Sequence, residues 1–101
     1  DAPPTELLAA VRSAAEGDYA EALSWYADRS IQTAERFEAE FDRAIETIAS
    51  DPERFPRCDE RHRFYLMRDF PFKIIYRQHG TGWVVIAVAH TAREPRFWSG
   101  R

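Results

Sequence analysis

The sequence is poor in the features that stabilise secreted or membrane-embedded chains. It contains a single cysteine, Cys58, so no disulfide bond can form within the chain, which fits a reducing compartment. The longest apolar run, Trp83–Ala89, has seven residues, far short of the roughly 20 that span a bilayer. No signal-peptide pattern follows Asp1. We therefore expect a cytoplasmic domain without a membrane-spanning segment.

Residue patterns that carry metal or nucleotide chemistry are also missing. The three histidines, His62, His79 and His90, are scattered, and no pair has the spacing of metal ligands. No glycine-rich phosphate loop is present, because Gly80 and Gly82 are explained by a hairpin turn. No serine or cysteine nucleophile has a local signature. The sequence predicts neither a metal nor any other cofactor.

Lysine is nearly absent, since 13 of the 14 basic residues are arginine, and the charge is unevenly distributed. Residues 1–50 carry four arginines against eleven acids, whereas residues 51–101 carry nine arginines and one lysine against six acids. Such a split can mark a surface for an anionic partner. It can equally reflect acidic helices that keep the protein soluble. Because the acidic half is the helical one, phosphate would repel the helices and no helix is expected to read DNA.

Two amphipathic helices are predicted in the acidic half. Ser13 and Glu16 have the spacing of a capping box, which starts a helix that runs to about residue 28. Ser30 is a cap for the second helix, which runs to about residue 50. The short break between them implies an antiparallel hairpin. The predicted buried stripes are Ala15, Tyr19, Ala22, Leu23 and Tyr26 in the first helix and Ala34, Phe37, Phe41, Ala44, Ile45 and Ile48 in the second.

Three strands are predicted in the basic half, over residues 61–67, 72–78 and 83–90. Alternation separates Phe72, Ile74 and Tyr76 from Lys73, Ile75 and Arg77 in the second strand, and Val84, Ile86, Val88 and His90 from Val85, Ala87 and Ala89 in the third. Both faces of the third strand are apolar, so we expect it to be the central strand.

The predicted fold is therefore α+β, with one domain over residues 1–101. An N-terminal antiparallel helical hairpin packs on one face of a small, mostly antiparallel three- to four-stranded sheet, and the other face is partly open. Residues 6–12 are predicted as a further short strand, although their leucines and alanines also suit a helix. Trp25 lies off the buried stripe of its helix and is expected to cover the seam between the helices, with a position facing a partner as the alternative.

Several short motifs follow one another between Ser13 and Trp98. They are Ala15-Glu16-Gly17-Asp18, Glu21-Ala22, Trp25-Tyr26, Ala34-Glu35-Arg36-Phe37, Ile48 with Pro52, Phe70-Pro71-Phe72, Ile75-Tyr76-Arg77, and Ala87-Val88-Ala89-His90 with Arg93, Pro95, Phe97 and Trp98. In this order they resemble the RelE/ParE superfamily of bacterial toxins, also called plasmid stabilisation proteins. The resemblance implies the toxin of a type II toxin–antitoxin pair, which a cognate antitoxin binds and silences.

The superfamily has two main activities, and the resemblance implies different residues for each. RelE-like members cleave mRNA in the ribosomal A site, whereas ParE-like members poison DNA gyrase without nuclease chemistry. The lysines that cleavage needs on the first strand fall at Phe64 and Leu66. Lys73 and Arg93 match two basic positions of the cleaving members, and His90 could act as a base. Because this catalytic set is incomplete, the preferred hypothesis is a toxin that poisons DNA gyrase. The first alternative is an mRNA endonuclease that uses His90, Arg93 and Lys73. The second is an inactive member of the superfamily that only binds its antitoxin.

The tail after the third predicted strand, the second predicted strand and the first predicted helix all offer candidates for partner contacts. Arg77, Arg96, Phe97, Trp98 and Trp25 combine cationic and aromatic character, which suits an acidic, amphipathic antitoxin segment. Phe97 and Trp98 stand where cleaving relatives often have a tyrosine, and neither has a hydroxyl. Purely structural roles are equally open for several of these side chains. These are a bond from His90 to a backbone carbonyl, ion pairs of Arg93 and Arg96 with acids such as Glu94, and packing of Trp98 onto the sheet. A homodimer through the helices is a further expectation.

Overall fold

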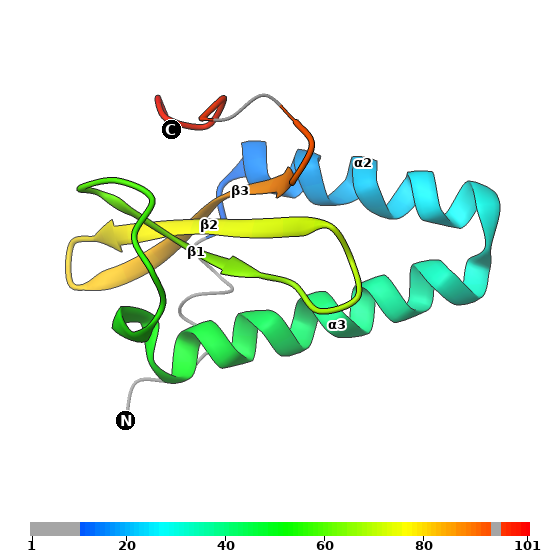
Figure 1. Cartoon of the computed structure of the whole chain (residues 1–101), viewed down its shortest axis with the longest axis horizontal. Coiled ribbons are helices and arrows are strands. Elements are labelled where there is room, and N and C mark those ends of the chain that lie inside the picture. The colour runs from blue at the N-terminus through cyan, green and yellow to red at the C-terminus, as the bar shows by residue number, and fades with distance from the viewer. Residues whose placement is uncertain (1–10, 94–95) are drawn as a thin grey trace.

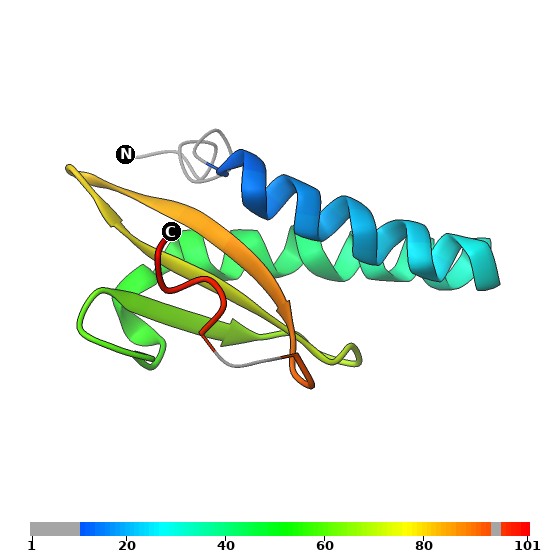
Figure 2. The ribbon, with the colours of Figure 1, turned by 90° about the horizontal axis from the view of Figure 1, so that it is seen from above.

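The computed structural model describes residues 11–93 and 96–101, and it shows an α+β domain (Figure 1). The elements are α2 (Ser13–Arg29), α3 (Ile31–Ser50), a 3-10 turn (Pro52–Arg54), β1 (His62–Leu66), β2 (Phe72–His79) and β3 (Gly82–His90). Both strand pairs are antiparallel, and the helical hairpin lies along one face of the sheet (Figure 2). The predicted fold class is confirmed. The predicted strand over residues 6–12 falls almost wholly outside the described residues.

Helix α2 covers the predicted range, but the predicted capping box at Ser13 is wrong. The N-cap is Arg12, which makes no side-chain capping bond, and Ser13 is the first helical residue. The Arg12 amide donates to the carbonyl of Val85 at 3.0 Å, while the Arg12 carbonyl accepts from the Glu16 amide at 2.9 Å. Arg12 is therefore extended beside β3, and the chain becomes helical at the next residue, which places Ser13 inside the first turn.

Helix α3 matches its prediction closely. The Ser30 hydroxyl accepts a hydrogen bond from the Thr33 amide at 3.1 Å, so Ser30 is the cap. All six residues of the predicted apolar stripe are buried. The helix ends at Ser50, just before Pro52, which lacks the amide needed to continue it. A strong helical period and clear end signals were sufficient to define this element.

The core between the helices and the sheet is built around Phe37, which is 0% exposed. Its ring lies 5.7 Å from the ring of Tyr19 and 5.2 Å from the rings of Tyr26 and Phe70. Phe72 of β2 contributes another edge-on contact at 5.4 Å. Each such pair adds about 0.5–1.5 kcal/mol beyond the burial of its area. This aromatic cluster joins both helices to the start of β2.

The predicted alternation of β3 holds up to Ile86 and is wrong beyond it. Ile75 of β2 pairs with Ala87, but the next residue, Tyr76, pairs with Val85, so Ile86 is the extra residue of a β-bulge. A one-residue shift moves all following side chains to the opposite face. Val85 and Val88 consequently pack in the core beneath the helices, whereas Val84, Ile86, Ala87 and Ala89 pack in the core on the other face.

Among the three described strands β2, and not β3, is central. The other edge of β3 accepts the bond from Arg12, the end of the predicted strand over residues 6–12 that lies almost wholly outside the described residues. The helices cover one face of β3, and the segment 96–101 after β3 covers the other (Figure 2). Trp98, which is 6% exposed, belongs to the core of this second face. The apolar character of both faces therefore reflects two covering layers, and the face expected to be partly open is closed by the tail.

Candidate functional site

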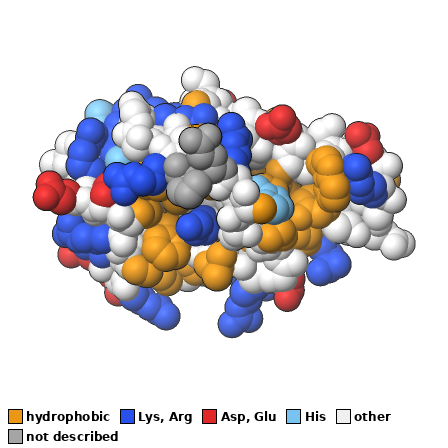
Figure 3. All heavy atoms as spheres, turned by 45° about the horizontal axis from the view of Figure 1, so that its top comes forward, with side chains coloured by type: hydrophobic (Ala, Val, Ile, Leu, Met, Phe, Trp, Pro, Cys, Tyr) orange, Lys and Arg blue, Asp and Glu red, His pale blue; other side chains and the backbone are white. Residues whose placement is uncertain are grey.

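An apolar groove of about 570 Å³ opens between α2 and the ends of β2 and β3 that lie farthest from their hairpin. Its lining residues are Asp18, Glu21, Ala22, Trp25, Tyr26, Pro71, Phe72, Val88, His90 and Arg93. In Figure 3 hydrophobic side chains gather in a patch on the right half of the face shown. Apolar side chains form most of the wall, with acids and bases among them. Such a lining suits an amphipathic ligand.

Trp25 is a wall of this groove and is 53% exposed, so the prediction that it covers the helix seam is wrong. The Arg29 guanidinium lies 3.6 Å from the centre of the Trp25 ring and donates a hydrogen bond to the Trp25 carbonyl at 2.8 Å. The ring also makes a T-shaped contact with Tyr26, at 5.2 Å between centroids. The indole is therefore an exposed aromatic surface that its neighbours hold in position.

His90 lies at the end of β3 and is exposed. Its Nδ1 is 3.0 Å from the amide of Ala92 and accepts that hydrogen bond, which fits a neutral ring with the proton on Nε2. The ring packs edge-on against Phe72 at 5.0 Å, on the helical side of the sheet. The expected bond to a backbone carbonyl is wrong, because the turn after β3 presents an amide to the ring.

Arg93 shares the groove with His90, and its guanidinium lies 3.8 Å from the centre of the Phe97 ring. Lys73 does not join them. Its Nζ lies 5.1 Å from the centre of the Phe64 ring, and it is not part of the groove lining. Lys73 also alternates with Phe72, which faces the helices. The structure thus brings together two of the three candidate catalytic residues and places the third on the other face of the sheet.

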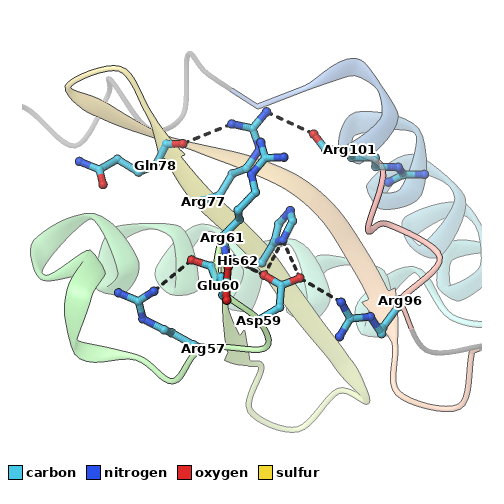
Figure 4. A network of polar contacts seen from close by, with 9 residues as sticks. All are labelled: Arg57, Asp59, Glu60, Arg61, His62, Arg77, Gln78, Arg96 and Arg101. Atoms are coloured by element: carbon cyan, nitrogen blue, oxygen red, sulfur yellow. Dashed lines mark hydrogen bonds and ion pairs between the residues drawn. The ribbon is translucent and has the colours of Figure 1, made fainter.

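The tail segment is attached to the sheet through Asp59. The Arg96 guanidinium is 3.3 Å from Oδ2 of Asp59, and His62 Nδ1 is 2.9 Å from Oδ1 (Figure 4). Trp98 packs edge-on against the His62 ring at 4.9 Å, as the sequence predicted for its packing onto the sheet. Arg96 is therefore in an ion pair, as one interpretation held, and its partner is Asp59.

The environment of Asp59 favours its charged form. Burial would raise its pKa, but hydrogen bonds from the His62 ring and from the amides of Arg61 and His62, together with the charge of His62, outweigh this and lower the pKa from its ordinary value. At neutral pH Asp59 is therefore a carboxylate that accepts bonds from the start of β1 and from the tail.

Asp18 is a residue that the sequence did not single out for a role. Its Oδ2 accepts from the Val88 amide at 3.1 Å and from the Arg101 guanidinium at 2.8 Å. Arg101 also donates to the carbonyl of Ile86 at 3.1 Å. Asp18 thus provides the hydrogen-bond acceptor for the Val88 amide, just past the bulge on the edge of β3, and it connects the tail to α2. No local pattern could have revealed this, since Asp18 and Arg101 are 83 positions apart.

The remaining partner-contact candidates lie away from the groove. Arg77 donates to the main-chain oxygens of Gln78 and Arg101, both at 3.2 Å. The ring of Phe97 is near two guanidinium groups, that of Arg93 at 3.8 Å and that of Arg101 at 5.2 Å. Within residues 11–93 and 96–101, no cluster of three side chains suited to metal binding is found. The same residues include no helix long and apolar enough to cross a membrane.

A helical hairpin packed on a three-stranded antiparallel sheet, with an apolar groove at its edge, defines a small α+β domain with a surface suited to protein partners. The chain matches the family described as the ParE toxin of type II toxin-antitoxin system, parDE, over residues 10–95. It belongs to this family and is a toxin of the type II class. A search of curated proteins found no match.

Proposed function

We propose that this toxin inhibits growth by binding DNA gyrase and that a cognate antitoxin neutralises it by binding the toxin. Membership of the ParE family supports this proposal. The observation that carries it is the separation of Lys73 from His90 and Arg93 by the sheet.

RNA cleavage through a ribose hydroxyl needs a base, an acid and a cation that reach one phosphate together. His90 and Arg93 share one groove, but Lys73 faces the opposite side of the sheet and is half-buried against Phe64. Phe97 and Trp98 carry no hydroxyl that could replace it. This arrangement favours an activity that depends on binding over one that depends on acid–base chemistry.

The groove supports binding to a protein. Trp25, Phe72 and Val88 supply apolar wall, while Glu21 and Arg93 offer charges of both signs. An amphipathic helix or strand can place its apolar side chains in such a groove and pair its charges with the residues around it. We assign this groove, with Trp25 and Arg93, to contacts with protein partners.

The test is induction of the toxin in bacteria without its antitoxin, with DNA breakage and mRNA integrity measured in the same cultures. We expect gyrase-dependent DNA breaks and intact transcripts. Trp25→Ala should abolish the breaks, whereas Leu66→Ala, which removes another exposed apolar side chain away from the groove, should keep them. Codon-positioned mRNA cuts that disappear in His90→Ala would overturn the proposal in favour of the nuclease. Absence of any growth effect would leave a protein that only binds its antitoxin.

A further inference from the structure

Three arginines from distant parts of the chain meet near the hairpin end of the sheet. Arg77 lies on β2, and its partner on β1 is His62, which directly follows Arg61. Arg12 is attached to β3 through the bond from its amide to Val85, next to the β3 residue that pairs with Arg77. Figure 4 shows the side chain of Arg61, which directly precedes β1, beside that of Arg77 on β2. The backbone register therefore brings Arg61 and Arg12 close to Arg77 from either side, and both charges act on the Arg77 guanidinium.

Within the described residues, no carboxylate forms an ion pair with any of these three arginines. The arginines that do pair with acids are Arg43, Arg96 and Arg101. Burial lowers the pKa of Arg77, and the positive charges of Arg61 and Arg12 lower it further. In the absence of a bound anion, the cluster is thus a site of mutual repulsion between like charges.

The guanidinium groups also have free hydrogen-bonding capacity. Arg77 has five N–H donors and uses one to Gln78 and one to Arg101, while its Nε is buried without a partner in the described structure. The side chains of Arg61 and Arg12 donate no hydrogen bond to a described residue. The unused donors and the unbalanced charge both favour binding of an oxyanion.

We propose that Arg12, Arg61 and Arg77 form a binding site for a carboxylate side chain of an acidic peptide segment. Guanidinium groups match the two oxygens of a carboxylate through paired N–H donors. This site lies at the hairpin end of the sheet, away from the apolar groove, and it does not depend on gyrase being the target. It would give the protein a second contact point for an extended partner.

The surroundings favour a peptide over a nucleic acid. A cleft of about 260 Å³ beside Arg61 is lined by Arg57 and Arg63 but also by Glu53 and Glu60. These acids interrupt the basic surface, whereas a nucleic acid presents a phosphate at every nucleotide and needs a continuous cationic track. A single carboxylate needs only a few N–H donors, such as those of Arg61 and Arg77, and no continuous cationic track. The cleft also contains Trp83, against which the apolar part of a peptide can pack.

The experiment uses the full chain and a synthetic glutamate-rich peptide, together with the same peptide in which glutamine replaces every glutamate. Calorimetry measures affinity, and the arginine Nε–Hε signals are followed by NMR. We expect the acidic peptide alone to bind and to shift the signals of Arg61 and Arg77. Arg61→Gln, which removes no described hydrogen bond, should weaken binding by about tenfold. Arg68→Gln, which removes a cation just beyond the far end of β1, should bind as the parent does.

Other outcomes overturn the proposal. Equal binding of the glutamine peptide would show that charge is not recognised, and equal losses in Arg61→Gln and Arg68→Gln would show that the net charge acts without a site. Stronger binding of a single-stranded oligonucleotide, with a steep dependence on salt, would assign the cluster to nucleic acid. Arg12→Gln serves as a second variant, and thermal unfolding of each variant shows whether a lost affinity comes from lost folding.

Discussion

The two faces of the sheet are closed in different ways. On the helical face, large aromatic side chains around Phe37 fill a continuous core between α3, α2 and β2. On the tail face, a smaller cluster is closed by one large aromatic, Trp98, and the tail is held by ion pairs with Asp59 and Asp18. Burial of apolar area dominates the first face, whereas a few polar bonds position the cover of the second. The two faces should therefore respond to different perturbations.

Phe37→Ala tests the helical face and should have the largest effect. Removing a fully buried phenylalanine leaves a cavity among four other aromatic rings, and such changes cost about 3–5 kcal/mol. Urea unfolding followed by circular dichroism measures the change in the free energy of unfolding. Glu38→Ala, at an exposed neighbouring position, is the control and should stay within about 0.5 kcal/mol. Equal stability of both variants would contradict the importance assigned to the aromatic cluster.

Trp98→Ala tests the cover of the second face. It removes the largest apolar side chain that the tail contributes, and we expect a loss of about 2–3 kcal/mol, below that of Phe37→Ala because the freed segment can move aside. Hydrogen exchange should increase in residues 96–101 and in β1 while the helices stay protected. Ser99→Ala is the exposed control. Uniform loss of protection throughout the chain would indicate that the two faces are not separable.

Asp18→Asn tests the bond between tail and α2. It removes the charge that accepts from Val88 and Arg101, which should cost about 1–3 kcal/mol. Arg101→Gln should cost less, and the double variant should fall short of the sum because both changes remove one interaction. Chemical unfolding of all three variants measures this coupling. Additive losses would show that the ion pair contributes nothing of its own.

Asp59 should make the tail face sensitive to acid. Its pKa is lower in the folded protein, so its contribution is present above the unfolded-state pKa of about 4 and is lost as the pH falls through the folded value. The difference in stability between the parent and Asp59→Asn should therefore be greatest near neutral pH and shrink below about pH 4. Thermal unfolding across this range measures it. A stability difference that does not change with pH would mean that the charge of the Asp59 carboxylate does not stabilise the tail.

Trp25→Ala should have the smallest effect on folding and a large effect on binding. The ring is 53% exposed at the groove, so the loss of its contacts with Tyr26 and Arg29 should lower stability by about 1 kcal/mol. Affinity for the antitoxin, measured with the purified pair, should fall by at least about tenfold, in keeping with a central aromatic contact. Unchanged affinity would move the partner surface away from the groove. Ile31→Ala provides a matched exposed apolar change outside the groove lining.

Prediction from sequence was most successful where one element carries its own signal. In α3, the period of the buried residues, the Ser30 cap and Pro52 define the helix without help from the rest of the chain. In β3 the predicted facing of Val88 was wrong, and β2 is the central strand of the three that are described. Apolar residues on both faces of a strand show that both faces are buried. They do not show whether helices or a tail segment bury each face, nor which strand is central in the sheet. A bulge depends on the paired strand, so it cannot be read from the bulged strand alone.

The candidate site likewise has features that could be predicted from local sequence and features that could not. His90 and Arg93 are close in sequence and end in one groove, so their association was predictable, whereas the exclusion of Lys73 follows from which face of β2 it occupies. The sequence by itself determined the two helices, the strand order along the chain and the family resemblance, because these depend on local periods and motifs. The tertiary structure alone decided the bulge at Ile86, the groove and the Asp18–Arg101 bond. These features depend on residues far apart in the chain, whose contacts form only when the helices and the tail pack onto the sheet.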